Sequence, residues 1–338
     1  IISGMAYGIA LSEKARIALA TAASKAGTAI NSGEGGILPE ELQAADNFIL
    51  QFGKNSWSKE EEVLKRANMI EIKFGQGALG AIGARIPPKD LPGRAREIMG
   101  LKEGEDAVIY DRFFENPTKR DIKEMVDSLR SISKGVPIGA KIMAGGRIEE
   151  DIDHLLEVGV DVIAVDGGQA ASLAAPPIMA DDFGIPTMHG IFRAARYLRE
   201  QGVKDQVTLI AAGGLFTPGE FLKVLALGAD AVYLGSAVLY SLTHKQVLKS
   251  LPWEPPTQVV WNDGKFKDQF DLQQGINTVY NFLMACVEEM KLGLRAMGKT
   301  SLSELSINDM VSYDQHIAKM LGIPYTFEPL VPERCEGR

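Results

Sequence analysis

The chain has 338 residues, 46% hydrophobic and 24% charged, so it is long enough to bury a large core. With 36 Lys and Arg against 44 Asp and Glu the formal net charge is −8, and no basic run with interleaved aromatics occurs, which argues against a nucleic-acid partner. Two cysteines, Cys286 and Cys335, favour a reducing, cytoplasmic location. The chain contains no stretch of about 18 uninterrupted apolar residues, so no membrane span is predicted. Because the chain begins inside a predicted strand, we expect further residues upstream, and a membrane anchor there stays open.

Short apolar segments alternate with helical patterns along the whole chain, which predicts parallel strands joined by helices. The predicted strands are 1–8, 28–36, 47–53, 69–77, 136–146, 160–168, 206–214 and 231–237. Nearly all of them end in glycine. Eight parallel strands with glycine-rich exits are typical of a (β/α)8 TIM barrel, an α/β fold whose site lies at the carboxyl ends of the strands. A doubly wound open sheet stays open as the alternative, because 47–53 is compatible with a helix.

The helix after the seventh predicted strand has clear boundaries. Thr217 is the expected N-cap, Pro218 follows in the first turn, and Glu220 lies three residues after the cap, the spacing of a capping box. Gly228 is the expected left-handed stop. A second helix is predicted within 116–135 by apolar residues at helical spacing.

Two segments fall outside the strand and helix alternation. Residues 77–117 are predicted to form a loop insertion that packs over the barrel mouth, with a proline-rich part at RIPPKDLPG. Residues 246–338 are predicted to be a helical C-terminal extension that packs on the barrel formed by 1–245, and not a second domain.

The exits of the last two predicted strands indicate a phosphate site. In phosphate-binding barrels the group lies after strands seven and eight, where backbone N–H groups approach it only if side chains are absent. Here strand seven ends in Gly213 and Gly214, and strand eight ends in Gly235 and Ser236. Tight turns after strands also need glycine, so each pair alone is a weak signal.

Other strand exits carry polar side chains. These are Asn31, Ser32, Glu34, Gln76, Lys141 and Asp166. A fixed positive charge at Lys141 suits a delocalised anion such as the polar edge of a reduced flavin. The alternative is a structural lysine paired with Asp166.

Glu34, Lys73 and the histidines are further candidates. Glu34 lies between glycines in a loop, which favours function, although a solvated acid is the alternative. Lys73 has the strand parity of Gly75 and not of Gln76, so we expect it to point away from the site. The four histidines have no metal-ligand spacing, and we predict no metal site; we expect His189 to cap or pack its helix.

Six motifs carry a resemblance to a known family. SGMAYGIALSEKA, INSGEGG, IEIKFGQGA, GAKIMAGG, VDVIAVDGGQAAS and AAGGLFTPGEFLKVLALGADAVYLGSA resemble, in order and spacing, the FMN-binding synthase domain of the glutamate synthase family. The resemblance spans roughly residues 3–240 and is closest to short, stand-alone members. It implies a (β/α)8 barrel, FMN as the phosphate ligand, and a flavoprotein oxidoreductase acting on CH–NH2 donors in glutamate biosynthesis or wider amino-acid metabolism.

The family pattern, together with the strand exits, defines the candidate residues. The candidate cofactor-binding residues are Met5, Ala6, Asn31, Gln76, Lys141, Asp166, Gly167, Gly168, Gly213, Gly214, Gly235 and Ser236. The candidate catalytic residues are Lys141, Gln76 and Glu34. The resemblance places Met5 and Ala6 beside the flavin ring, and Glu34 near the substrate.

The chain also departs from the family pattern. Family synthases bind an iron–sulfur cluster through three cysteines after the eighth strand, but LYSLTHKQVLKSLPWEPPTQ contains none, so no cluster is predicted. In the substrate loop, Leu79 replaces a lysine and Ile82 an acid, and Arg85 is a candidate substitute clamp for a carboxylate. An additional residue in YGIALS weakens the assignment of Ala6.

The leading hypothesis is an FMN-dependent oxidoreductase that exchanges hydride at flavin N5 with a small imine or amino-acid-like substrate. Its electron donor is open between a reduced pyridine nucleotide and a ferredoxin-like protein, and a homo-oligomer is compatible with the sequence. One alternative keeps the barrel and makes the protein a phosphate-ligand isomerase or lyase. Another is a non-catalytic flavoprotein subunit.

Overall fold

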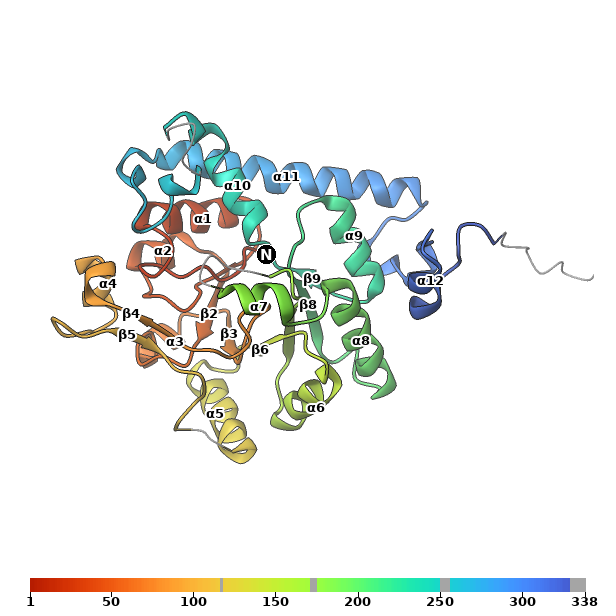
Figure 1. Cartoon of the computed structure of the whole chain (residues 1–338), viewed down its shortest axis with the longest axis horizontal. Coiled ribbons are helices and arrows are strands. Elements are labelled where there is room, and N and C mark those ends of the chain that lie inside the picture. The colour runs from red at the N-terminus through yellow and green to blue at the C-terminus, as the bar shows by residue number, and fades with distance from the viewer. Residues whose placement is uncertain (116–117, 171–174, 250–255, 329–338) are drawn as a thin grey trace, which may run out of the picture.

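A curved sheet of parallel strands forms the centre of the molecule (Figure 1). The structure is a computed structural model and describes residues 1–115, 118–170, 175–249 and 256–328. The strands of this sheet follow the order β1 (Ile30–Asn31), β2 (Phe48–Phe52), β3 (Met69–Lys73), β6 (Ile138–Met143), β7 (Val162–Asp166), β8 (Thr208–Ala212) and β9 (Ala231–Val232). Every neighbouring pair in this order is parallel.

The first residues of the chain join the two edges of this sheet. Ile2 forms parallel bridges both to Ile30 at β1 and to Leu234 just after β9. The Asn31 N–H donates to the carbonyl oxygen of Ile2 at 3.0 Å, and the Leu234 N–H donates to that of Ile1 at 2.9 Å. An open sheet would leave two free edges. The predicted (β/α)8 barrel is therefore confirmed, the open-sheet alternative is wrong, and 47–53 is a strand.

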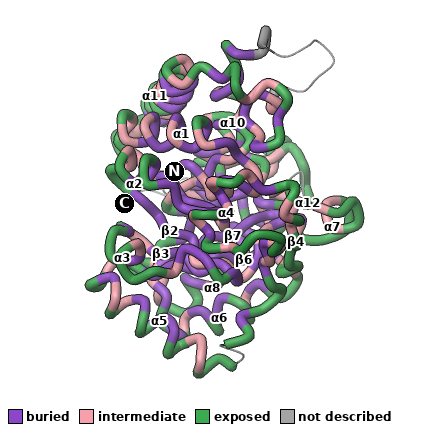
Figure 2. The backbone as a smooth tube through the Cα atoms, turned by 90° about the vertical axis from the view of Figure 1, so that its left-hand side faces the viewer, coloured by how far each residue is buried: buried purple, intermediate pink, exposed green. Residues whose placement is uncertain are grey.

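Helices surround the barrel and follow its strands. They are α1 (Glu13–Lys25), α2 (Pro39–Ala44), α3 (Glu61–Leu64), α5 (Lys119–Ile132), α6 (Ile148–Val158), α7 (Pro177–Asp182), α8 (Thr187–Glu200), α9 (Pro218–Leu227) and α10 (Ser236–Thr243). Figure 2 shows the strands as a buried centre with exposed and half-buried segments around it. The predicted boundaries of α9 are confirmed, because Thr217 and Glu220 form the capping box and Gly228 is left-handed at φ +118°.

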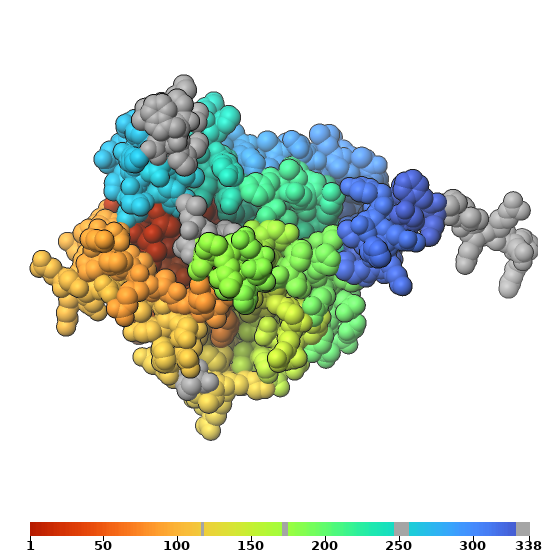
Figure 3. All heavy atoms as spheres, in the orientation of Figure 1, coloured from red at the N-terminus to blue at the C-terminus, as the bar shows by residue number. Residues whose placement is uncertain are grey.

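The insertion between β3 and β6, the fourth and fifth barrel strands, has structure of its own. Strands β4 (Ala84–Ile86) and β5 (Ala107–Ile109) pair antiparallel, with η1 (Pro88–Asp90) and α4 (Gly93–Ile98) between them. This segment shares an apolar cluster with Tyr7, Leu38 and Trp57, which come from loops that follow the first three barrel strands. The insertion therefore packs beside the mouth, and Figure 3 shows it (orange) on the same face as α7 (green).

Beyond α10 the chain returns along the helical layer. The 3-10 helices are η2 (His244–Lys249), η3 (Pro256–Val259), η4 (Lys267–Gln269), η5 (Leu302–Glu304) and η6 (Ile307–Asp309), and the α-helices are α11 (Leu272–Ala296) and α12 (Gln315–Leu321). Helix α11 packs along α1, α9 and α10 (Figure 1). Among the described residues no helix is both long and apolar enough to cross a bilayer.

Candidate functional site

A buried polar cluster lies inside the barrel beneath its mouth. The carboxylate of Glu71, on β3, accepts hydrogen bonds from Asn31 Nδ2 at 2.8 Å, Gln51 Nε2 at 2.8 Å and the Tyr233 hydroxyl at 2.7 Å. All four side chains are at least 95% buried. Burial, and then the charge of Glu71, raise the pKa of Tyr233 well above its ordinary value, so the phenol keeps its proton and donates it.

This cluster positions the loop that carries Glu34. Asn31 Oδ1 accepts from the Gly33 N–H at 2.9 Å, one residue before Glu34. A Cβ added at Gly33, where φ is +70°, would lie 2.8 Å from backbone atoms of Met5 and Ala6. The loop after β1 and the exit of the first segment therefore touch, which brings Met5, Ala6 and Glu34 to one side of the mouth.

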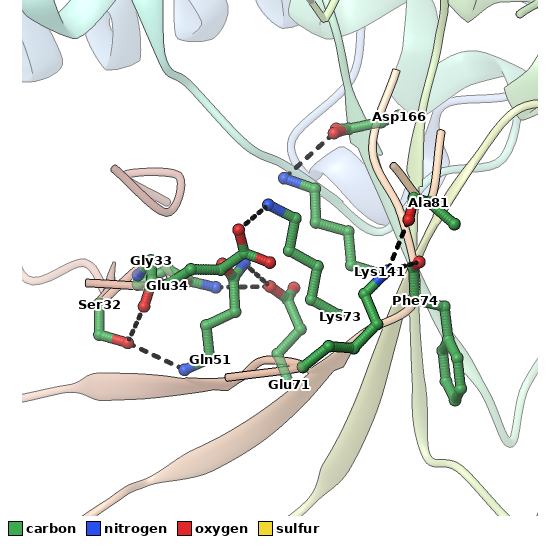
Figure 4. A network of polar contacts seen from close by, with 12 residues as sticks. Ser32, Gly33, Glu34, Gln51, Glu71, Lys73, Phe74, Ala81, Lys141 and Asp166 are labelled. Atoms are coloured by element: carbon green, nitrogen blue, oxygen red, sulfur yellow. Dashed lines mark hydrogen bonds and ion pairs between the residues drawn. The ribbon is translucent and has the colours of Figure 1, made fainter. Parts of the chain in front are cut away.

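Lys141, two residues before the end of β6, forms an ion pair with Asp166, the last residue of β7. Their Nζ and Oδ2 atoms are 3.1 Å apart, and both side chains are about 95% buried (Figure 4). Burial opposes the charge on Lys141, but the carboxylates of Asp166 and Glu71 outweigh it and raise the lysine pKa. Burial raises the pKa of Asp166, against the effect of Lys141. The ion pair with Asp166, the structural alternative for Lys141, is therefore present, and it leaves a fixed ammonium at the mouth.

Lys73 lies beside Lys141, and the prediction that it points away from the mouth is wrong. The two lysines are direct partners in the register of β3 and β6, and Lys73 Nζ is 2.9 Å from Glu34 Oε2. Lys73 shares the inward parity of Glu71, whereas Gln76 lies beyond the end of β3, in a turn where strand parity no longer applies. Glu34 is 14% exposed and paired, so it is not the solvated acid of the alternative.

The turn that carries Gln76 is held by a lysine that the sequence did not single out. Lys54 Nζ donates to the carbonyl oxygens of Phe74 at 3.0 Å, Ala81 at 3.2 Å and Asp111 at 3.2 Å. Burial lowers the pKa of Lys54, and the charge of Glu34 opposes that shift. This ammonium ties both ends of the insertion to the exit of β3, and so fixes the turn around Gln76.

The altered substrate loop does not bring Arg85 to the mouth. Its side chain is 71% exposed and pairs with Asp106 at 2.7 Å across the β4–β5 hairpin. Ile82 is 44% exposed. The candidate carboxylate clamp at Arg85 is therefore directed to a different partner.

The glycines after β7 and β8 allow their backbones to meet closely. A Cβ on Gly167 would lie 2.1 Å from Thr187 Oγ1, and one on Gly214, where φ is +65°, would lie 2.6 Å from Gln169 Cβ. Gln169 Oε1 in turn accepts from the Thr187 backbone N–H at 2.8 Å and from its hydroxyl at 2.9 Å. Gly213 (φ +108°) lies in the same contact. These glycines are required by packing as well as by any ligand.

Gly235 is different, because it faces open space. A Cβ there would have no neighbour within 4 Å, and Gly235 is the N-cap of α10 without a side-chain cap. Among the described residues nothing accepts a hydrogen bond from the backbone N–H groups of Gly235, Ser236 or Ala237. Unpaired N–H groups at a helix N-terminus attract phosphate, so these residues fit the phosphate of FMN.

The predicted site residues thus gather at the strand exits, with two qualifications. Asn31 is fully buried and holds Gly33 and Glu71, beneath the mouth. His189 is half-buried at the start of α8 with no partner for Nδ1 among the described residues.

Part of the loop after Gly168, residues 171–174, lies outside the described residues. In the described ranges no three His, Cys, Asp or Glu side chains form a group suited to a metal.

The fold is one found in flavin oxidases. A mandelate oxidase variant with a monooxide FMN adduct superposes with a TM-score of 0.55 at 16% identity, covering 89% of this chain and 76% of that one. At this identity the likeness shows the fold alone, an α/β barrel shared with FMN-dependent oxidases.

The family follows from the sequence comparison. A model described as the conserved region in glutamate synthase matches residues 1–300, so the chain belongs to the glutamate synthase family.

Two relatives show the extent of the match. The archaeal-type glutamate synthase [NADPH] of a Thermotoga species is 30% identical over 332 residues, which cover 96% of this chain and 64% of the relative. The archaeal glutamate synthase [NADPH] of Methanocaldococcus jannaschii is 29% identical over 309 residues, covering 91% of this chain and 60% of the relative. The chain spans less than two thirds of the length of these relatives.

Proposed function

We propose that this chain binds FMN and is an oxidoreductase of the glutamate synthase type, acting on a small imine or amino-acid-like substrate. The observation that carries the proposal is the buried ammonium of Lys141 at the mouth, held by Asp166 at 3.1 Å. Family membership and the fold shared with an FMN-containing oxidase support it.

The phosphate would be held by the backbone of Gly213, Gly214, Gly235 and Ser236. The open space at Gly235 and the unpaired N–H groups of α10 support this end of the site. At the other end, Lys141 and Gln76 would contact the polar edge of the ring, and Met5 and Ala6 would lie beside it.

The bound flavin would supply two-electron chemistry at N5. Lys141 would stabilise negative charge on the reduced ring, since its raised pKa keeps the ammonium charged and its position is fixed by a buried partner. Gln76 would orient the substrate from the turn that Lys54 holds. Glu34, paired with Lys73 at the mouth, would contact the substrate's polar groups.

The particular substrate and the electron donor are more specific parts of the proposal. The apolar Leu79 and the outward Arg85 argue for a substrate with fewer charged groups than a dicarboxylate. We keep a reduced pyridine nucleotide or a ferredoxin-like protein as the electron donor, and the names of both relatives contain NADPH. Four further points are predictions from the sequence: the absence of an iron–sulfur cluster, a homo-oligomeric state, a boundary near residue 245 between barrel and extension, and a cytoplasmic location. The last is based on the two cysteines.

The proposal is tested by replacing the charged pair. Lys141→Met alone would leave Asp166 buried without its partner, so the test variant is Lys141→Met with Asp166→Asn. We expect this double variant to bind FMN but to be reduced more slowly than the wild type, and at a more negative potential. Lys204→Met, a lysine paired with Asp230 away from the mouth, is the control. Unchanged reduction kinetics and potential in the double variant would remove Lys141 from the mechanism.

The remaining alternatives predict other outcomes of the same experiment. A phosphate-ligand isomerase or lyase would be colourless and would not bind added FMN. A non-catalytic flavoprotein subunit would bind FMN and turn over no imine or amino-acid substrate.

A further inference from the structure

A cavity of about 520 Å³ lies beside the mouth, between α10, η2, α11 and the loop after β8. This is the size of a small-molecule pocket. Its described lining residues are Phe216, Ala237, Tyr240, Ser241, His244, Lys245, Thr278, Asn281 and Phe282. None of the residue roles proposed above involves this cavity.

Aromatic rings are enriched in the lining. Phe216, Tyr240 and Phe282 are three of the nine residues, whereas aromatics are 7% of the chain. The rings of Phe216 and Tyr240 are 6.1 Å apart with an interplanar angle of 34°, and these side chains are 42% and 60% exposed. Exposed aromatic faces at a cavity favour a flat aromatic ligand, because stacking is available to any planar ring.

The charge of the lining favours an anion. The chain carries a net charge of −8, yet none of the described lining residues is Asp or Glu, and Lys245 supplies an ammonium. Lys245 and His244 lie together at the start of η2 and are exposed. A ligand with a negative group would find an attractive charge at Lys245, while the nearby Glu220 carboxylate is occupied by the backbone N–H groups of Phe216 and Thr217.

The lining also has polar groups that a ligand would satisfy. Ser241 Oγ is buried and has no hydrogen-bond partner among the described residues. An unpaired buried hydroxyl is costly, so a ligand atom that pairs with it gains affinity. On α11, the amide of Asn281 can donate and accept, as the edge of a heterocyclic base requires. The Thr278 hydroxyl donates to carbonyl oxygens of its own helix and is left as an acceptor.

The cavity lies next to the end of the barrel where the phosphate cradle is. Ala237, in the first turn of α10, lines the cavity, and Gly235 and Ser236 immediately precede it. Phe216 follows Gly214 by two residues. A ligand in this cavity would therefore lie beside the cradle, behind the first turn of α10.

We propose that this cavity is a nucleotide-binding site. The base would stack on Tyr240 and Phe216 and pair with Ser241 Oγ and Asn281, and the phosphate would lie near Lys245. Two sources share this chemistry, a free mononucleotide and the adenylate half of a reduced pyridine dinucleotide. The second would make the cavity the anchor of the electron donor, and only that part rests on the proposed flavin function.

The test is calorimetric titration of the full chain, with its bound cofactor, with AMP, adenosine, NADPH and inorganic phosphate. We expect AMP to bind more tightly than adenosine, and phosphate alone not to bind at this site. Tyr240→Ser should weaken AMP by about tenfold through lost stacking. Lys245→Met should weaken AMP but leave adenosine unchanged. Tyr313→Ser, which changes an 83% exposed tyrosine outside the cavity, is the matched control.

The outcomes separate the two sources and the two proposals. If NADPH competes with AMP and reduces the flavin, the cavity anchors the donor. If AMP binds and NADPH does not, the site takes a mononucleotide. Failure of all nucleotides to bind, or binding that Tyr240→Ser and Lys245→Met leave unchanged, overturns the inference. FMN content, read from the absorption spectrum of the same sample, reports separately on the proposed function.

Discussion

Replacing Tyr233 by phenylalanine tests the polar cluster beneath the mouth. The substitution keeps the ring and removes one hydroxyl, whose hydrogen bond to Glu71 Oε2 is 2.7 Å long and fully buried. Hydrogen bonds to charged groups contribute about 1.5–3 kcal/mol each. Glu71 keeps its bonds from Asn31 and Gln51, so the variant should still fold, with a free energy of unfolding lower by about 2 kcal/mol.

The assay is thermal unfolding followed by circular dichroism. At about 2.1 cal/mol/K per residue, the unfolding entropy of a chain of 338 residues is roughly 0.7 kcal/mol/K, so the expected decrease in Tm is roughly 3 °C. Tyr197→Phe is the matched control, because the Tyr197 hydroxyl bonds to Asp153 at 3.1 Å at the surface and should contribute less than about 0.5 kcal/mol. Equal shifts in the two variants would refute the reasoning.

Three further outcomes are expected. Gly235→Ala should leave the free energy of unfolding unchanged and weaken FMN binding at least tenfold, because the added Cβ fills the open space proposed for the phosphate. Gly214→Ala should lower the free energy of unfolding by more than about 1 kcal/mol, because Gly214 has a positive φ and a close contact. Equal FMN affinity in Gly235→Ala and the wild type would contradict this. Lys54→Met should speed limited proteolysis within 77–117, and Lys65→Met, at an exposed lysine on α3's C-cap, should not. The hydrogen bond from Arg193 on α8 lowers the pKa of Glu149 from its ordinary value of 4.5. The ion pair therefore stabilises the fold above about pH 4.5, and this stabilisation is lost as the pH falls through the pKa of the folded state. Glu149→Gln should lower the free energy of unfolding in urea by less than about 1 kcal/mol at pH 7, and the difference from the wild type should vanish in acid.

The barrel was predictable because each strand carries its own local signal. An apolar run that ends in glycine is enough to place a strand and its exit, and Thr217 with Glu220 is enough to begin α9. The sequence of β2 is also compatible with a helix, but a closed barrel of eight strands requires a strand at this place. The hairpin within the insertion was not predictable, because β4 and β5 have three residues each and depend on contacts with Tyr7 and Trp57.

Only some of the polar residues at and beneath the mouth were predictable from the sequence. Lys141, Asp166 and Glu34 stand at strand exits, where position alone suggests function. Glu71 lies inside β3 and Tyr233 directly after β9, 162 residues away in sequence, and their side chains meet only because the barrel closes. The alternation in IEIK could have indicated Glu71, since it places the acid and Lys73 on the same face as one another.

The central claim is that the mouth of this barrel holds FMN, and binding of FMN tests it most directly. The purified chain is freed of any bound chromophore, and FMN is titrated into it while quenching of flavin fluorescence is followed. We expect saturable binding of one FMN per chain that Gly235→Ala weakens at least tenfold. A folded wild-type protein that leaves FMN fluorescence unchanged would contradict the account.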